Sequence, residues 1–321
     1  MRAYVIRRVL LLIPTFFLLT ILVFLSVRFI PGDVIDLLMF RMVMESGGGS
    51  SIDREQFERR LGLDVPAYVQ YTRWMGGILL RGDLGKPLLR AESVGELISG
   101  RLLVTIELGL VSILIGLLIG VPIGIYSAIK QNTLGDYVGR SFAIFGLATP
   151  NFWLATIILV FPAIWWGWSP PLRLTRIGDD PLAHLSMFIA PGLILGTYLA
   201  AGTMRMTRTM MLEVLRQDYI RTAWAKGLRE RVVILRHAIK NALIPVVTLI
   251  GLQLPLVVGG AVIMEQMFAI PGLGRLMIDA LFDRDYPLIS GINLFFAIAV
   301  MTINLFIDLL YSYLDPRIQY K

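Results

Sequence analysis

Two short patterns in this sequence could bind a phosphate group, but neither is complete. Gly85-Lys86 matches the end of a phosphate-binding loop, which needs a glycine five residues before its second glycine and Ser or Thr after its lysine. This chain has Leu80 and Pro87 at those two positions. The glycine pair at 272–274 follows a proline and has no predicted strand before it, which favours a turn. We therefore predict that this chain has no nucleotide site.

Catalytic and metal-binding sets are equally hard to assemble. Asp279, Asp283 and Asp285 lie close together in the sequence. Because Arg284 stands among them and the segment falls at a predicted membrane surface, a solvated loop is preferred over a metal site. The chain has no cysteine, which excludes thiolate ligands, and only two histidines. We predict no catalytic residue, no metal site and no cofactor bound by this chain.

A third pattern is a basic segment, 217–245, between two long apolar runs. Residues 206–215 and 217–226 are rich in helix formers, and Gly227 is a natural break before a further helix. A helix–glycine–helix element with exposed charge would form a rigid coupler that leads into the next apolar run. Its spacing predicts apolar residues towards the membrane side and accessible basic residues: Val232, Val233, Leu235, Ile239 and Leu243 against Arg229, Arg231, Arg236 and Lys240.

The composition is that of a membrane protein. Hydrophobic residues make up 56% of the 321 and charged residues 17%, with a mean hydropathy of +0.72. A helix that crosses a bilayer needs about 20 apolar residues. Runs without Lys, Arg, Asp or Glu occur at 9–27, 108–129, 141–172, 181–204, 241–264 and 286–307. We predict six transmembrane helices, the first being a retained span rather than a cleaved signal peptide.

The charges predict how the spans are oriented. Short cytoplasmic loops carry an excess of Lys and Arg. With six spans, the side that holds both termini totals +10 and the opposite side −3, which together give the formal net charge of +7. We therefore expect both termini and the basic segment in the cytoplasm. The basic composition then needs no nucleic-acid partner.

The region 28–101 is long enough to form a small external subdomain. Residues 52–61 and 67–80 have helical spacing, and Tyr68, Tyr71 and Trp74 lie on neighbouring turns of the second helix. These aromatic residues either pack the subdomain and rest on the membrane surface, or form a platform for an external partner.

Small residues and prolines mark the spans themselves. Gly116, Gly120 and Gly124 recur every four residues and predict close helix packing, within this chain in preference to a dimer. Four prolines within spans predict kinks rather than breaks, because neighbouring helices can satisfy the freed carbonyl groups: Pro122, Pro150, Pro191 and Pro255. His184, near a span end, is interpreted as an interfacial residue rather than a proton relay.

Two stretches of the basic segment carry a family resemblance. They read Asp218-Tyr219-Ile220-Arg221-Thr222-Ala223-x-Ala225-Lys226-Gly227-Leu228 and Arg236-His237-Ala238-Ile239-Lys240-Asn241-Ala242-Leu243-Ile244-Pro245. Both resemble the EAA loop of the inner-membrane permeases of ABC importers for dipeptides, oligopeptides and nickel, in their B-type subunit. The Glu-Ala-Ala of the general loop is replaced by Arg-Thr-Ala, as is usual in the peptide branch. Further matches are Pro31-Gly32-Asp33, Leu61-Gly62-Leu63-Asp64, Arg81-Gly82-Asp83-Leu84-Gly85, Ala148-Thr149-Pro150-x-Phe152-Trp153, Ile270-Pro271-Gly272-Leu273-Gly274-Arg275 and Leu314-Asp315-Pro316-Arg317.

The resemblance implies a type I ABC importer permease fold. That fold is all-α and polytopic, with six transmembrane helices and a small external subdomain between the first two. It divides the chain into a transmembrane helix (1–30), an external, periplasmic segment (31–101), a five-helix core (102–315) with a cytoplasmic coupling loop (205–242), and a cytoplasmic tail (316–321). It also implies that these residues couple the chain to an ATPase: Asp218, Tyr219, Arg221, Thr222, Ala223, Ala225, Lys226, Gly227 and Leu228.

The same resemblance implies partners, cargo and location. The partners are a second homologous permease, two ATP-binding-cassette ATPase subunits that bind ATP and Mg, and an external substrate-binding protein. This chain would then be no enzyme, and would lie among the lipids of a bacterial or archaeal cytoplasmic membrane. Peptides are the implied cargo, with nickel chelate or oligosaccharide as alternatives. A self-sufficient secondary transporter is a distant alternative, because neither buried ion-pairing residues nor inverted repeats are visible. The sequence leaves the residues of the substrate pathway unknown.

Overall fold

The computed structural model describes residues 2–29, 35–36, 39, 44, 54–171 and 173–314, which form helices and turns without a strand. They divide into two compact units, described here separately. The first unit comprises Met1–Ile6, Leu102–Arg275 and Val300–Lys321, and the second comprises Arg7–Arg101 and Leu276–Ala299. Pro31-Gly32-Asp33, Asp315-Pro316-Arg317 and the tail 316–321 lie outside the described residues, and the division into 1–30, 31–101, 102–315 and 316–321 stays a prediction.

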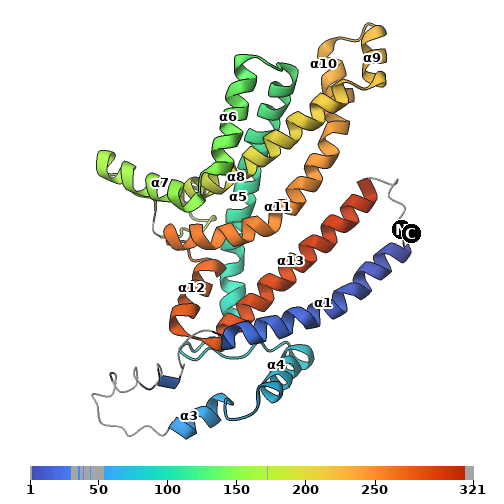
Figure 1. Cartoon of the computed structure of the whole chain (residues 1–321). Coiled ribbons are helices and arrows are strands. Elements are labelled where there is room, and N and C mark those ends of the chain that lie inside the picture. The colour runs from blue at the N-terminus through green and yellow to red at the C-terminus, as the bar shows by residue number, and fades with distance from the viewer. Residues whose placement is uncertain are drawn as a thin grey trace. The chain divides into compact units, whose positions relative to one another are not determined.

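The first unit is built on α8, which packs against α6 and α11 (Figure 1). Asp180 caps the start of α8 by accepting hydrogen bonds from the backbone N–H groups of Leu182 and Ala183, and Pro181 occupies the first turn, where no N–H is needed. The helices of this unit are α5 (Val94–Ile129, whose first turns belong to the second unit), α6 (Leu134–Ala148), α7 (Asn151–Trp166), α8 (Pro181–Leu215), α9 (Asp218–Ala225), α10 (Glu230–Val232), the π-helix η1 (Val233–Ala238) and α11 (Ile239–Met267).

Five helices are long and apolar enough to cross a membrane, and a sixth span is present if the bent pair of α6 and α7 is one. The two helices of the pair meet at 96°. The expectation of a mere kink at Pro150 is therefore wrong. Thr149, the residue before the proline, adopts an extended conformation with ψ 123° and ends α6. Pro122, Pro191 and Pro255 lie inside continuous helices, as predicted.

The glycine stripe of α5 packs against α8 within the chain. A Cβ atom on Gly120 would lie 2.7 Å from the carbonyl oxygen of Ala200, and one on Gly124 would lie 2.7 Å from that of Met204. Real Cβ atoms do not approach so closely, so these positions need glycine if the two backbones are to touch. Packing within the chain, rather than a dimer interface, accounts for the stripe.

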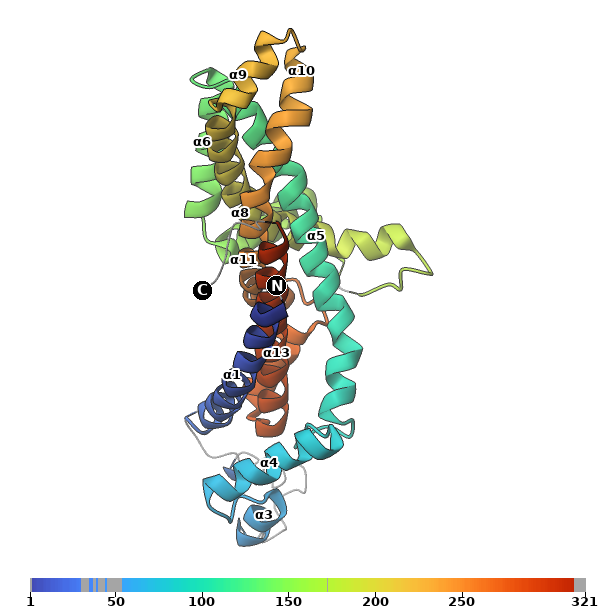
Figure 2. The ribbon, with the colours of Figure 1, turned by 90° about the vertical axis from the view of Figure 1, so that its right-hand side faces the viewer.

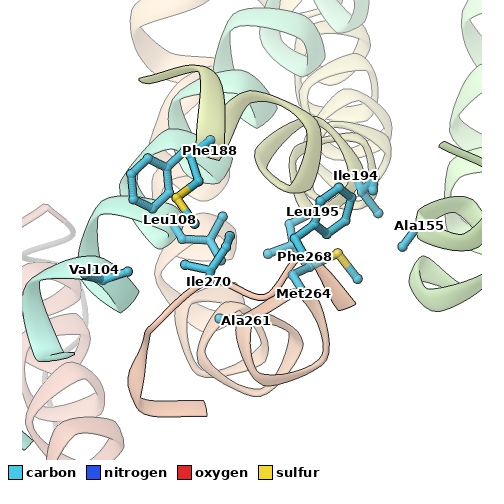
Figure 3. Close-up of a cluster of buried hydrophobic side chains, with 11 residues drawn as sticks. Val104, Leu108, Ala155, Phe188, Ile194, Leu195, Ala261, Met264, Phe268 and Ile270 are labelled. Carbon is cyan, nitrogen blue, oxygen red and sulfur yellow. The ribbon is translucent and has the colours of Figure 1, made fainter. Parts of the chain in front are cut away.

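A cluster of buried side chains joins α5, α7, α8 and α11 (Figure 3). Leu108, Phe188, Met264 and Ile270 are at most 1% exposed. Where these helices cross a membrane, lipid tails are as apolar as the side chains, so close packing rather than escape from water stabilises the cluster.

The turn after α11 is organised by a buried carboxylate. Glu265 is fully buried and accepts hydrogen bonds from the Thr105 hydroxyl (2.6 Å) and the Arg275 backbone N–H (3.0 Å). Its carboxyl group fills the space beside Gly272, where a Cβ atom would lie 2.2 Å from the carboxyl carbon. The predicted turn therefore ends at Gly272, which lies against the carboxylate, whereas Leu273 and Gly274 already belong to the next helix, Leu273–Asp283.

The second unit contains α1 (Arg2–Arg28), α3 (Arg54–Leu61), α4 (Ala67–Arg81), α12 (Leu273–Asp283) and α13 (Tyr286–Leu314), of which α1, α12 and α13 continue into the first unit. Aromatic rings join α4 to α1. The ring centre of Phe24 lies 5.3 Å from that of Tyr71 and 6.0 Å from that of Trp74. Two of the three predicted aromatic residues therefore pack the unit, whereas Tyr68 is 73% exposed.

Asp285 caps α13 and is not part of a solvated loop. It is 1% exposed and accepts hydrogen bonds from the backbone N–H groups of Leu88 (2.9 Å) and Leu288 (3.2 Å). Burial raises the pKa of its carboxyl group, an effect that the N–H donors and Arg90 oppose. The expectation of a solvated loop was wrong for this residue, because its carboxylate oxygens accept hydrogen bonds from backbone N–H groups instead of from water. Among the described residues, no group of His, Cys, Asp or Glu is arranged to hold a metal ion.

Candidate coupling site

The basic segment lies at one end of the first unit. α8 continues beyond the predicted span end at 204 to Leu215, and Arg216 closes its last turn. Gln217 is extended, with ψ 148°, and the chain then starts α9. Figures 1 and 2 show α9 and α10 together at this end, beyond α8 and the start of α11.

Gly227 ends α9 with a left-handed turn, as the sequence predicts. Its φ is +77°. The Gly227 N–H donates to the carbonyl of Trp224 (2.9 Å), and the Leu228 N–H donates to that of Ala223 (3.4 Å). These two bonds form a Schellman motif, which fixes the angle at which the chain leaves the helix. The turn is therefore a defined corner rather than a loose link.

Two residues of α9 anchor it to the rest of the unit. Ile220 is fully buried and Ala223 is 7% exposed, one turn apart on the same face. They pack with Ala128 of α5, Met211 of α8 and Val233 of η1 in one cluster. Burial of Ile220 alone is worth about 1.5–3 kcal/mol in a water-exposed loop. The cluster thereby joins α9 to three other helices.

The opposite face of α9 points outward. Asp218, Arg221, Thr222 and Ala225 are exposed and lie on one side of the helix, at spacings of three, four and seven residues. Asp218 and Arg221 form an ion pair with an N–O distance of 3.4 Å, and their side chains are 97% and 70% exposed. Such an exposed pair contributes little to stability. Its charges are available to a partner instead.

Aromatic residues flank that outward face. Tyr219 is 44% exposed and Trp224 is 42% exposed. The Tyr219 hydroxyl accepts a hydrogen bond from the side-chain amide of Asn241 (2.9 Å), which ties α9 to the start of α11. Trp224 stands at the unspecified position of the motif, so sequence reasoning missed it. The signal that could have identified it is a large aromatic residue at a position of this helix that does not belong to its buried face.

Eight of the nine predicted coupling residues are exposed, and Ala223 alone is buried. They gather on α9 and its closing turn: Asp218, Tyr219, Arg221, Thr222, Ala225, Lys226, Gly227 and Leu228 on the surface, Ala223 in the anchor. The structure thus brings the predicted set together, while the role of its members stays a prediction.

The segment after Gly227 differs from the expected pattern. Val233, Ala238 and Ala242 are buried, whereas Val232 is 39% and Leu235 is 55% exposed. The segment contains the π-helix η1, whose backbone hydrogen bonds span five residues instead of four, so its turn is wider and its buried face shifts from that of an α-helix. The basic residues 229, 231, 236 and 240 are accessible, as predicted.

The expectation that the chain has no buried ion-pairing residues is wrong, because α6 and α8 share a buried ion pair. Arg208 of α8 donates from Nε to Asp136 Oδ1 (2.7 Å) and from Nη2 to Oδ2 (2.8 Å), a bidentate arrangement. Asp136 of α6 is fully buried and is also hydrogen-bonded to the Ser127 hydroxyl and the Asn132 backbone N–H. The pair joins the α5–α6 turn to α8. Its sequence signal was an acid and a base at the predicted cytoplasmic ends of neighbouring spans.

A second pair lies at the other end of α8. His184 is 8% exposed, with Nδ1 2.7 Å from the Thr175 carbonyl oxygen and Nε2 3.2 Å from Glu107 Oε2. Because a carbonyl oxygen can only accept, Nδ1 donates to it, and the two contacts fix the orientation of the ring. Both groups thus have partners that lock α8 to α5.

The chain is similar to a known family along most of its length. The family model described as binding-protein-dependent transport system inner membrane component matches residues 120–320. The oligopeptide transport system permease protein AppB of Bacillus subtilis (strain 168) is 42% identical over 327 residues, with 100% of both chains covered. The dipeptide transport system permease protein DppB of Escherichia coli (strain K12) is 37% identical over 348 residues, again with 100% of both covered.

Solved structures show the same fold. An inward-facing MetNI methionine ABC transporter matches with a TM-score of 0.56 and 17% identity, covering 70% of this chain and 100% of that chain. An amino acid ABC transporter with histidines matches with a TM-score of 0.53 and 16% identity, covering 68% and 93%. The all-α fold of an importer permease, expected from the sequence, is therefore confirmed.

Proposed function

The chain belongs to the family of binding-protein-dependent transport system inner membrane components, and we propose that it is the permease subunit of an ATP-driven importer of short peptides. The observation that carries the proposal is the outward face of α9, which is rigidly held and leads into both neighbouring spans. Full-length similarity to permeases named for oligopeptide and dipeptide transport supports peptides as the cargo.

The packing of α9 would transmit a displacement of this helix to its neighbours. A partner that moves α9 displaces Ile220 and Ala223 together with the ends of α5, α8 and η1, because these residues form one packed cluster. The Asp136–Arg208 pair keeps α6 in register with α8. We propose that ATPase subunits supply the push, with ATP and Mg bound there, and that the spans switch between inward-facing and outward-facing states.

The proposed assembly contains a second homologous permease, two ATPase subunits and an external substrate-binding protein. The predicted orientation, with both termini and α9 in the cytoplasm, supports docking of the ATPases on α9. It leaves the predicted external segment 31–101 on the outer side, where a binding protein would deliver cargo. The chain would reside in a bacterial or archaeal cytoplasmic membrane and would hydrolyse no ATP itself.

Uptake in a strain that lacks this chain separates the possible cargoes. Labelled dipeptide, a nickel chelate and an oligosaccharide are supplied in turn, with the intact gene restored as a control. We expect restored uptake of the dipeptide alone. Uptake of nickel or of the sugar without the peptide would keep the importer class and overturn the peptide assignment.

A further inference from the structure

The second unit contains a cavity of about 340 Å³ among α1, α4, the loop after α4 and the start of α13. Phe24, Trp74 and Tyr286 contribute aromatic walls, and Arg28 and Arg73 also line it. Its volume is at the lower end of the range for small-molecule sites. None of these residues belongs to the proposed coupling surface.

The polar groups of this cavity are mainly donors. Arg28 and Arg73 carry positive charge, and none of the described lining residues is acidic. The Arg28 guanidinium lies 3.5 Å from the centre of the Phe24 ring and bonds to the Phe24 carbonyl and to Gln70, which leaves further N–H groups on its planar fork. The indole N–H of Trp74 is buried and has no acceptor among the described residues.

A buried, unpaired indole N–H and two guanidinium groups in the lining of one cavity indicate an anionic acceptor. A buried donor without a partner costs about 1–3 kcal/mol, so a guest that supplies an oxygen is favoured there. Phosphate and carboxylate oxygens are the groups that guanidinium binds best. Apolar and aromatic walls favour a guest whose remainder is also apolar.

The position of the cavity decides between possible guests. Arg28 is the last residue of the span Ile6–Arg28, and Tyr286 is the first of the span Tyr286–Leu309. With six spans both ends lie on one side, at the boundary between lipid and water. Basic and aromatic side chains at this depth meet lipid headgroups.

The apolar surface of α1 leads away from the cavity. Leu18, Leu22 and Leu25 are 58%, 53% and 39% exposed and lie on one face of the helix, one turn before Arg28. A lipid whose headgroup lies at Arg28 would place its acyl chains along this stripe. The same surface would offer nothing to a free, water-soluble anion.

We propose that this cavity binds the phosphate of an anionic phospholipid, with Arg28, Arg73 and the Trp74 N–H as donors. This site is separate from the proposed coupling surface and does not depend on the nature of the cargo. Its occupant belongs to the membrane itself and would brace α4 against α1 in the second unit.

Native mass spectrometry of the assembled complex, purified in detergent with the full chain, tests the site. Phosphatidylglycerol and phosphatidylcholine with the same acyl chains are added in turn. We expect the wild type to retain phosphatidylglycerol preferentially. Arg73→Gln should weaken retention about fivefold, the effect of removing one basic residue near an anionic lipid surface. Trp74→Phe, which keeps an aromatic ring without the N–H, should weaken it several-fold.

Arg81→Gln is the matched control, because Arg81 lies on the same helix, is exposed and does not line the cavity. It should retain phosphatidylglycerol as the wild type does. Equal retention by Arg73→Gln, Trp74→Phe and Arg81→Gln would overturn the proposal, as would displacement of the lipid by inorganic phosphate. Unchanged lipid retention with weaker capture of the external binding protein would instead identify a protein carboxylate as the guest and overturn it too.

Discussion

The helix α9 has a buried face that anchors it and an exposed face. Ile220 and Ala223 hold the helix, whereas Arg221 and Trp224 face solvent. Behind them, the buried Asp136 pairs with Arg208, which is 18% exposed at its side chain. Substitution of a residue on the exposed face of α9 should therefore affect docking of the ATPase subunit. Substitution in the buried pair should affect the stability of the chain.

Asp136→Asn should destabilise the chain by about 2–3 kcal/mol, because the charge-assisted bonds to Arg208 are lost and a guanidinium group is left without its carboxylate. Thermal unfolding in detergent measures this. Arg216→Gln serves as the control, because Arg216 is exposed and closes α8, the helix that carries Arg208. This variant should unfold like the wild type. A wild-type unfolding temperature for Asp136→Asn would show that the pair contributes nothing.

Arg221→Glu should weaken binding of the ATPase subunit and leave stability almost unchanged, since its ion pair with Asp218 is exposed. Co-purification at increasing salt gives the affinity. Arg176→Glu makes the same charge change at an exposed residue on the predicted outer side and should have no effect. Normal assembly of Arg221→Glu would remove this residue from the contact surface.

For the helices, the sequence predicted which segments are helical better than it predicted where the helices bend. The span runs and the corner at Gly227 were visible because apolar length and a glycine after a helix are local signals. The 96° bend at Pro150 and the π-helix at 233–238 were not, because both depend on which carbonyl groups find partners after packing. For the same reason, Val233 is buried as predicted, but Ala238 and Ala242 are buried where Ile239 and Leu243 were expected.

Gly227→Val should uncouple ATP hydrolysis from transport. A β-branched residue resists a φ of +77°, at a cost of about 1–2 kcal/mol, while a Cβ atom there meets no neighbour within 4 Å. The effect is thus one of backbone conformation, and Gly227→Asn, which tolerates that φ, should retain more coupling. The ratio of ATP hydrolysed to substrate moved is the measurement. Equal ratios for both variants and the wild type would count against a coupling role for the corner.

Gly272→Ala should prevent correct assembly of the turn after α11. Its Cβ atom would lie 2.2–2.3 Å from the buried carboxyl group of Glu265, which cannot move without losing its bonds to Thr105 and Arg275. Gly259→Ala in α11 is the control, since a Cβ atom there meets nothing within 4 Å. Membrane insertion and monodispersity in detergent should fall for the first variant only. A monodisperse Gly272→Ala protein would show that the turn can relax.

The whole molecule combines two compact units that carry different features. The first carries the coupling helix, the glycine-packed helices α5 and α8 and the buried Asp136–Arg208 pair. The second carries the aromatic packing of α4 on α1 and the cavity proposed for a lipid. The nature of the cargo could not be predicted from the spans or the charges, because the sequence holds no pattern that identifies a peptide as the substrate.

Transport by purified components in lipid vesicles distinguishes an ATP-driven permease from a self-sufficient transporter. The chain is reconstituted with its second permease, its ATPase subunits and the binding protein, and uptake of labelled dipeptide is followed with and without ATP. We predict uptake only when ATP and the ATPase subunits are both present, and its loss with Gly227→Val despite continued ATP hydrolysis. Uptake by the permease chains alone, driven by an ion gradient without any ATPase, would contradict the account.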